Sequence, residues 1–201
     1  MVVEVSEKIQ KNEIQAREVL GLSISSLSYQ DVLNKIFDLA NERMHSYVCF
    51  ANAHMAIEAK QNPIVRNSVN NATIVTSDGM SVVMAMKYIH KVKQDRTAGM
   101  DMIYDIIQGA SKHKLSLFLF GSSQQTLDIF IKKAKTDFPE LHISGAIAPP
   151  YSDIDHMDNA TYLDEMRASE AQLILVSLGC PKQEQWMAKY SDQVPAVMLG
   201  I

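Results

Sequence analysis

The sequence predicts an α/β fold in which a mostly parallel sheet has helices on both faces. Short apolar runs alternate along the chain with segments whose apolar residues recur at helical spacing, which is typical of βαβ units. The apolar runs are continuous, as in strands that are covered on both faces. The 201 residues contain no internal repeat, low-complexity tract or linker, which favours a single folded domain.

The first half of the chain begins with a polar, charged stretch. We expect residues 1–18 to form an N-terminal extension and residues 19–201 to form the domain. Ser28 precedes Asp31 by three residues, a spacing like that of a capping box, which predicts a helix start. The expected elements are an edge strand over 19–24, a helix from 28 to about 44, a buried strand over 47–51, a helix from about 55 that breaks at Pro63, a strand over 73–76 and a helix over 80–89.

The second half continues the alternation after a polar loop over 90–99. Asp101 can cap the helix that follows this loop. Proline suits a first helical turn, so Pro181 is expected to open the helix that holds Gln183 and Trp186. The other expected elements are a helix over 102–112, a strand over 115–120, a helix over 124–138, a strand over 143–147, a helix over 158–169, and strands over 173–178 and 197–201.

Composition and charge limit the classes of partner. The net charge of −4 gives no basis for a nucleic-acid partner and argues against broad electrostatic docking on anionic lipid. No apolar window is long enough for a signal peptide or a membrane span, so a lipidic substrate would be met at the membrane surface. Cys49 and Cys180 lack metal-ligand spacing and are expected to be buried free thiols in a reducing cytoplasm.

Polar or glycine-containing turns follow four of the expected strands. In open parallel sheets, ligands bind beyond the carboxyl ends of the strands, and the N–H groups of a following helix can hold a diphosphate. A nucleotide-type ligand is therefore expected at this edge, although any doubly wound fold offers the same arrangement. The four turns are Asn52-Ala53-His54, Ser77-Asp78-Gly79, Gly121-Ser122-Ser123 and Gly179-Cys180-Pro181-Lys182-Gln183.

Each candidate residue also has a purely structural interpretation. Asp78, placed before Gly79, is either a plain helix cap or turn residue or a catalytic carboxylate. His54 and Glu58 lie four residues apart on one helical face, but no third ligand accompanies them, which favours a structural or site-lining histidine over a metal ligand. Asp153-Ile154-Asp155 is a D-x-D sequence, but it lies in a polar loop rather than at a strand end, so no metal site is expected.

Several common nucleotide-binding and hydrolase motifs are absent. The turn at Gly121 lacks the GxGxxG sequence of dinucleotide binders, which makes an NAD-dependent enzyme an unfavoured alternative. The sequence also has no GxxxxGK[ST] phosphate loop and no GxSxG nucleophile turn.

Six short motifs, taken together, resemble the WecG/TagA/CpsF glycosyltransferase family. Each motif is weak alone, but the six occur in the family's order and spacing, from about residue 19 to the last residue. They are YVCFANAHM at 47–55, SDGM at 77–80, RTAGMD at 96–101, LFG at 119–121, APPY at 148–151 and LGCPKQE at 178–184.

This resemblance implies a Rossmann-like fold and an inverting transfer that makes a β linkage. Family members move a sugar such as N-acetylmannosamine, its uronic acid or glucose from a UDP-sugar to an undecaprenyl-diphosphate-linked sugar. The products enter teichoic acid, enterobacterial common antigen, capsule or exopolysaccharide. No cofactor or metal is implied, because the UDP-sugar is a substrate. The implied location is the cytoplasm, at the inner face of the membrane, with self-association possible.

The resemblance also assigns expected roles by position. Asp78 matches the proposed catalytic base, and Gln183 matches an active-site glutamine of the last motif. A carboxylate at a strand end could take the proton from the attacking hydroxyl group. The motif positions expected to bind substrate are Asn52, His54, Gly79, Arg96, Gly99, Asp101, Gly121, Ser122, Tyr151, Gly179, Pro181 and Lys182.

The chain departs from the family pattern at two places. Phe50 stands where many members have a threonine. The chain ends at Ile201, where members continue with a glycine-rich turn, a Phe-Asp pair and a basic segment that is thought to complete the site and reach the membrane. The expectation is a chain that folds but binds UDP weakly, transfers little sugar and does not associate with the membrane, and a non-catalytic nucleotide-sugar-binding module is the alternative.

Overall fold

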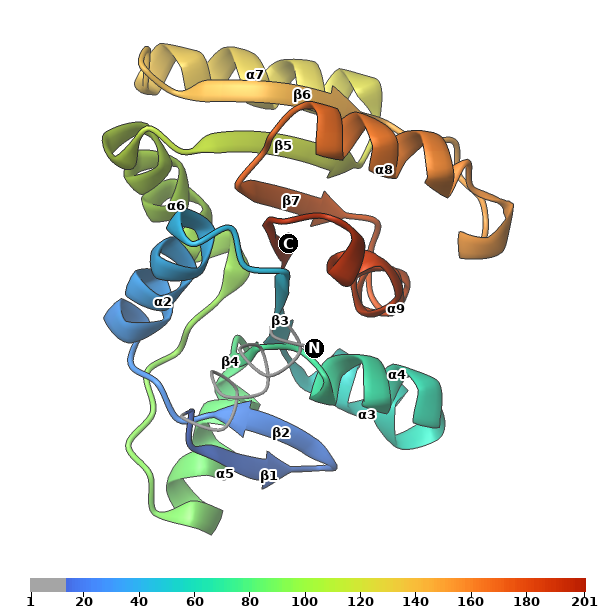
Figure 1. Ribbon diagram of the computed structural model, residues 1–201. Coiled ribbons are helices and arrows are strands. Elements are labelled where there is room, and N and C mark those ends of the chain that lie inside the picture. The colour runs from blue at the N-terminus through green and yellow to red at the C-terminus, as the bar shows by residue number, and fades with distance from the viewer. Residues whose placement is uncertain (1–13) are drawn as a thin grey trace.

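The computed structural model describes residues 14–201, and its centre is one six-stranded sheet (Figure 1). The strand order is β4-β3-β8-β7-β5-β6, and every neighbouring pair is parallel. The strands are β3 (Ser46–Ala51), β4 (Ile74–Ser77), β5 (Ser116–Gly121), β6 (His142–Ile147), β7 (Leu173–Ser177) and β8 (Val197–Gly200). The predicted α/β class and the predicted parallel sheet are confirmed.

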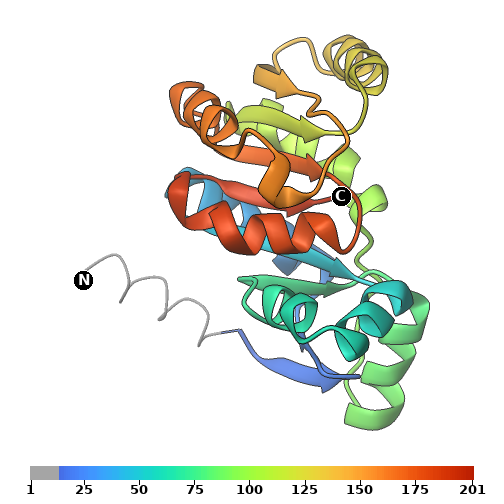
Figure 2. The same cartoon turned by 90° about the vertical axis from the view of Figure 1, so that its right-hand side faces the viewer.

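Helices cover both faces of this sheet, as predicted (Figures 1 and 2). One face packs against α2 (Tyr29–Asn41), α6 (Gly99–His113) and α7 (Gln124–Asp137). The other face packs against α3 (Ala53–Gln61), α4 (Pro63–Asn70), α5 (Met80–His90), α8 (Asn159–Ala168) and α9 (Lys182–Tyr190).

Alternation along each strand produces these two cores. Tyr47, Cys49 and Ala51 of β3 face the α3–α9 side, whereas Val48 and Phe50 face the α2–α6 side. All six residues of β3 are buried, which explains why the strand reads as a continuous apolar run.

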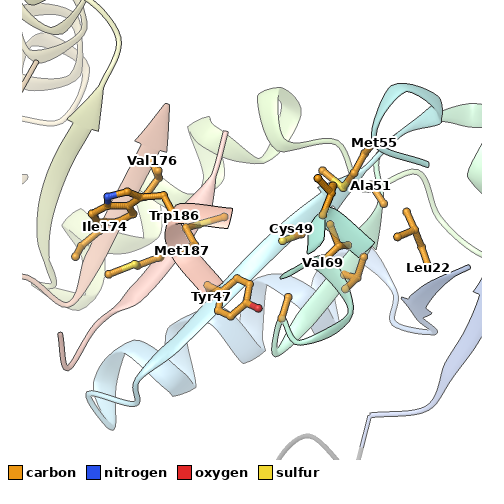
Figure 3. Close-up of a cluster of buried hydrophobic side chains, with 14 of the residues drawn as sticks. Leu22, Tyr47, Cys49, Ala51, Met55, Val69, Ile174, Val176, Trp186 and Met187 are labelled. Atoms are coloured by element: carbon orange, nitrogen blue, oxygen red, sulfur yellow. The ribbon is translucent and has the colours of Figure 1, made fainter. Parts of the chain in front are cut away.

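Trp186 of α9 anchors the core on the α3–α9 side (Figure 3). Its indole is fully buried, lies 4.5 Å from the Phe120 ring between centroids, and donates a hydrogen bond to Asn159 Oδ1 at 2.7 Å. Aromatic side chains bury large areas, and a buried indole N–H needs an acceptor. These two contacts hold α9 against β5 and the start of α8, and so help to fix the turn that precedes α9.

The predicted edge strand over 19–24 is wrong in detail, because these residues belong to a hairpin. β1 (Ala16–Val19) pairs antiparallel with β2 (Leu22–Ser25) in a separate two-stranded sheet. Leu20 and Gly21 form the turn, with φ of 53° and 85°, and this left-handed pair closes a two-residue hairpin. Of the expected extension over 1–18, residues 1–13 lie outside the described residues, and the last three belong to β1.

Three smaller predictions also need correction. Asp101 does not cap α6, because that helix begins two residues earlier, at Gly99, with Ala98 as its N-cap. Pro181 is itself the N-cap of α9 rather than part of its first turn. Cys49 is fully buried, but Cys180 is only half-buried, and neither cysteine forms a disulfide. The predicted start of α2 is confirmed, since Ser28 Oγ accepts a hydrogen bond from Asp31 N at 3.1 Å.

Over residues 14–201, no helix combines the length and the apolar character needed to cross a bilayer.

Candidate functional site

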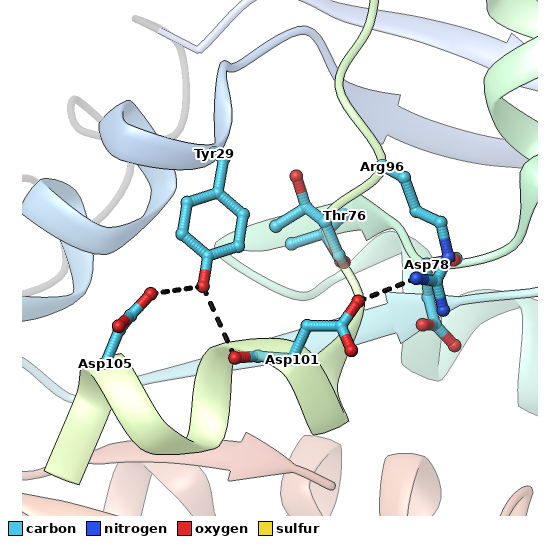
Figure 4. A network of polar contacts seen from close by, with 7 residues as sticks. Tyr29, Thr76, Asp78, Arg96, Asp101 and Asp105 are labelled. Atoms are coloured by element: carbon cyan, nitrogen blue, oxygen red, sulfur yellow. Dashed lines mark hydrogen bonds and ion pairs between the residues drawn. The ribbon is translucent and has the colours of Figure 1, made fainter.

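A first group of polar residues meets where β3 and β4 end, and Figure 4 shows three of its members, Asp78, Arg96 and Asp101. Asn52 follows β3 and caps α3, accepting from Met55 N at 3.0 Å. Its amide also donates to the Asp78 carboxylate at 3.3 Å. Gly79 lets this approach happen, because a Cβ there would lie 3.3 Å from the Asn52 Cα. The two strand-end turns are therefore joined by the Asn52–Asp78 contact.

The loop before α6 closes over Asp78 from the other side. Arg96 Nε donates to the Asp78 backbone oxygen at 2.9 Å, and the Arg96 guanidinium pairs with the Asp101 carboxylate at 2.6 Å. This loop is tied to β4, since Thr97 N donates to the Ser77 oxygen at 2.9 Å. The structure thus brings together Asn52, Asp78, Gly79, Arg96, Gly99 and Asp101 from three separate motifs.

The carboxyl group of Asp78 is half-buried and subject to opposing influences. Burial raises the pKa of Asp78, and this effect is the largest. The hydrogen bond from Asn52, the charge of Arg96 and a hydrogen bond from the Gly99 backbone lower it, while the charge of Asp101 raises it. A carboxyl group with a raised pKa, held by several donors at a strand end, can accept a proton from a bound hydroxyl group.

A second group of residues lines a polar pocket where β5, β6 and β7 end. Ser122 and Tyr151 lie in it with Lys182, the first residue of α9. The Lys182 ammonium lies 4.9 Å from the centre of the Tyr151 ring and donates to the Ser152 oxygen at 3.2 Å. Tyr151 is almost fully exposed. At a pocket rim, a flat aromatic ring can stack on a nucleobase, and a cation can bind a phosphate group.

The turn after β7 lies between the two groups. Gly179 has a φ of 82°, and its N–H donates to Gln183 Oε1 at 3.2 Å, so the Gln183 side chain folds back over its own turn. The Gln183 amide also lies close to Gly200 at the end of β8, where an added Cβ would be 3.3 Å from Nε2. β8 pairs with β3 on one side and with β7 on the other. Gln183 therefore lies toward the middle of the row that the carboxyl ends of the strands form.

The helices that start at this edge differ in how their N-termini are satisfied. Side chains cap α3 and α7, through Asn52 and Ser123. The N-caps of α5, α6 and α9 are Gly79, Ala98 and Pro181, which make no side-chain cap hydrogen bond. Free N–H groups at a helix start attract anions. At the start of α6 the Gly99 N–H already donates to Asp78, so the uncapped helix starts left for a ligand are that of α5 beside the first group and that of α9 beside the second.

Candidate metal ligands do not gather within residues 14–201, where no group of three or more His, Cys, Asp or Glu side chains could hold an ion. His54 is exposed on α3 and belongs to no such group. Asp155 pairs with Lys189 at 2.8 Å and lines a separate hollow between α4 and α9.

Sequence reasoning missed Glu184, which is fully buried at the first turn of α9. Among the described residues, neither of its carboxylate oxygens has a hydrogen-bond partner of normal geometry. Burial raises the pKa of Glu184, and the nearby side chains of Gln183 and Cys180 offset this only in part. Burial likewise raises the pKa of Cys180 to about 12, so this thiol stays protonated. Glu184 precedes Met187 by three residues, which puts both on the same face of a helix. This spacing was a signal that could have predicted the burial of Glu184.

An apolar pocket, also not predicted, opens beside the second group. It lies between α6, α7 and the ends of β5, β7 and β8. Its lining includes Met100, Ile103, Ser122, Phe130, Ser177 and Ile201.

Comparison with known proteins gives one family over nearly the whole chain. The model of the "Glycosyl transferase WecG/TagA/CpsF family" matches residues 17–201. The chain is similar to a protein of Bacillus spizizenii named N-acetylglucosaminyldiphosphoundecaprenol N-acetyl-beta-D-mannosaminyltransferase, with 32% identity over 78% of the chain. Proteins of the same name in Bacillus subtilis and Staphylococcus aureus are 24% and 21% identical over 87% and 92% of the chain.

These relatives are longer than the matched region. The match spans 59% of the Bacillus spizizenii protein, 66% of the Bacillus subtilis protein and 72% of the Staphylococcus aureus protein.

Proposed function

The chain belongs to the WecG/TagA/CpsF family of glycosyltransferases, and from this premise we propose that it transfers a sugar from a UDP-sugar to a lipid-diphosphate-linked sugar, with inversion. The proposed sugar is of the N-acetylmannosamine type or a related hexose. The names of the relatives support an acceptor in which a sugar is joined to undecaprenol through a diphosphate. The proposed product enters teichoic acid or another cell-surface polysaccharide.

The placement of Asp78 is the observation that most supports this proposal. In the proposed step, the acceptor hydroxyl oxygen attacks the anomeric carbon and its proton passes to the Asp78 carboxylate. The bond between the anomeric carbon and the diphosphate oxygen breaks, and UDP leaves with the electron pair. Asn52, Arg96 and the Gly99 N–H hold Asp78 in place for this transfer.

The polar pocket at the ends of β5–β7 is the proposed site of the UDP portion. Lys182 and the uncapped start of α9 would offset the charge that develops on the leaving diphosphate. Tyr151 would stack on the nucleobase of UDP. Gln183 lies between this pocket and Asp78, where it would contact the transferred sugar. His54, Gly121, Ser122, Gly179 and Pro181 remain proposed as lining residues.

The proposed reaction requires no cofactor, because the donor carries its own leaving group, and no divalent metal, because Lys182 and the start of α9 are proposed to offset the charge of the leaving diphosphate. The proposed location is the cytoplasm, at the inner face of the cell membrane, where a lipid-linked acceptor would present its diphosphate.

A transfer assay tests the proposal directly. The chain is incubated with a panel of UDP-sugars and a short-chain lipid-diphosphate-linked N-acetylglucosamine, and the disaccharide product is detected by mass spectrometry. A matched control acceptor carries the same sugar on the same chain without the diphosphate. We expect product from one or a few donors and with the diphosphate acceptor only. UDP binding without transfer from any donor would instead support a non-catalytic nucleotide-sugar-binding module.

A further inference from the structure

Helix α5 is apolar on its outward side as well as on its inward side. Val82 and Met86 are buried against the core, as expected for a helix that covers a sheet. On the opposite side, Met80, Met84 and Tyr88 follow one another at intervals of four residues and are 56%, 50% and 60% exposed. The outward stripe of a surface helix is normally polar. An apolar stripe of this kind therefore indicates a contact that covers it.

The same helix and the loop after it carry a concentrated positive charge. Lys87, Lys91 and Lys93 are exposed, and no aspartate or glutamate occurs between Asp78 and Asp95. Although the net charge of the whole chain is −4, the stretch between Asp78 and Asp95 is locally cationic. Lysine side chains can lie along an apolar surface while their ammonium groups reach outward, and the Lys87 ammonium lies 5.5 Å from the centre of the Tyr88 ring.

The position of α5 links this surface to the candidate site. The helix lies at the rim of the molecule, beyond edge strand β4, with the β1–β2 hairpin beside it (Figures 1 and 2). It begins at Met80, two residues after Asp78, and its 11 residues extend for roughly 16 Å. A planar surface in contact with the outward stripe would therefore pass close to the edge that holds Asp78.

We propose that the outward face of α5, formed by Met80, Met84, Lys87, Tyr88 and Lys91, docks on the surface of a membrane that contains anionic lipid. Methionine and tyrosine side chains would enter the boundary between headgroups and acyl chains, and the lysines would pair with lipid phosphates. The inference rests on the proposed function in one respect, namely that a lipid-linked acceptor gives the protein a reason to meet a membrane. The local charge, rather than the net charge, decides this contact, because screening limits the attraction to about 8–10 Å.

Vesicle sedimentation tests the proposal without any sugar substrate. The chain is mixed with vesicles of phosphatidylcholine alone, or with vesicles that also contain phosphatidylglycerol. We expect binding to the second kind and a loss of binding as salt is raised. The double variant Met84→Gln/Tyr88→Gln and the double variant Lys87→Gln/Lys91→Gln should each bind at least tenfold more weakly, since each surface lysine contributes roughly fivefold.

The control is the double variant Ile64→Gln/Ile129→Gln, which removes apolar side chains that are 65% and 62% exposed on α4 and α7. It should bind vesicles as the unaltered chain does. All variants change exposed side chains, so their thermal unfolding midpoints should match. Absence of binding to anionic vesicles, or equal loss in the control and the α5 variants, would overturn the proposal. So would a dimer that dissociates only in the α5 variants, because a second copy would then cover the stripe.

The outcomes separate this proposal from the proposed function. If the chain transfers sugar to a short-chain acceptor but does not bind anionic vesicles, the membrane surface is wrong and the transferase stands. If it binds vesicles through α5 but transfers nothing, the proposed reaction is wrong and the membrane surface stands.

Discussion

At the scale of single residues, Asp78 and Glu184 are two acids whose surroundings prepare them for different roles. Both have a raised pKa, and burial is the main cause for each. Asp78 is half-buried and receives hydrogen bonds from Asn52 and Gly99, which support its charged form. Glu184 is fully buried, and within the described part of the chain no group of normal hydrogen-bond geometry reaches its oxygens. The first acid is suited to proton transfer, whereas burial disfavours the charged form of the second.

Replacement of the proposed base should stop transfer while leaving the nucleotide site intact. Asp78→Asn preserves the shape of the side chain and removes its basicity, so we expect the rate to fall about 100-fold or more. UDP affinity, measured by calorimetry, should change little. Asp155→Asn is the matched control, because Asp155 is exposed and pairs with Lys189 in a different hollow. Near-normal turnover by Asp78→Asn would remove Asp78 from the mechanism.

Glu184 should make the stability of the protein depend on pH. Its pKa in the folded state lies above the ordinary value of 4.5, so the folded state retains a proton that the unfolded state releases. The free energy of unfolding should therefore decrease as pH rises through and above that ordinary value. Glu184→Gln removes the titration and should be more stable than the unaltered chain at neutral pH, with the difference closing in acid.

Urea denaturation at several pH values measures this effect. Glu140→Gln, at an exposed position, is the control and should leave the pH dependence unchanged. A stability difference between Glu184→Gln and the unaltered chain that stays constant from acid to neutral pH would show that Glu184 does not hold a proton in the folded state.

At the scale of elements, the strand-end turns position the candidate site, and two of them depend on a glycine with a positive φ. Gly121 has a φ of 111° and lies against β7, where an added Cβ would be 2.3 Å from the Ser177 oxygen. Gly179 has a φ of 82°, but nothing lies within 4 Å of an added Cβ. The first glycine is required both by backbone conformation and by a close approach, and the second by conformation alone.

Replacing each of these glycines with alanine should separate the requirement for a left-handed backbone conformation from the requirement for a close approach. Gly179→Ala should cost about 1–2 kcal/mol, the usual penalty for a left-handed conformation. Gly121→Ala should cost more, on the order of 3 kcal/mol or above, because a clash with backbone adds about 1–3 kcal/mol. Chemical denaturation of both variants measures the difference. Equal losses would mean that β5 and β7 can move apart at this turn without cost.

At the scale of the whole molecule, the parallel sheet gathers residues from six motifs at one edge. The strand order places β8 between β3 and β7, so the group around Asp78 and the pocket at Lys182 lie on the two sides of Gln183. The D-x-D carboxylates are not part of either group. Asp153 is exposed, and the hydrogen bond from Lys189, together with the charge of that lysine, lowers the pKa of Asp155.

This arrangement leads us to expect transfer that is independent of divalent metal. An assay in excess EDTA should give the same rate as an assay with added magnesium or manganese, because amide, lysine and helix-start groups are available to meet the diphosphate charge. Activity that disappears with chelator and returns with metal would contradict this. The variant Asp153→Asn/Asp155→Asn would then show whether these carboxylates hold the ion.

The sequence by itself determined the succession of strands and helices along the chain, the parallel class of the sheet and the motifs at the strand ends. These features depend on local periodicity and capping, as at Ser28, and on the rule that parallel strands end at one edge. The sequence did not predict the hairpin at Leu20-Gly21. A left-handed turn there interrupts an otherwise continuous run of strand-forming residues, which the sequence pattern presents as one strand.

Only the tertiary structure decided which strand ends become neighbours, because strand order depends on packing between segments distant in sequence. It joined Asn52 to Asp78, placed Gln183 beside Gly200 and buried Glu184 without a hydrogen-bond partner among the described residues. It also left Met80, Met84 and Tyr88 on the outer side of α5, which the apolar composition of that helix could not reveal. Composition gives the total of apolar residues in a helix, whereas the neighbours of the helix decide which of its sides is covered.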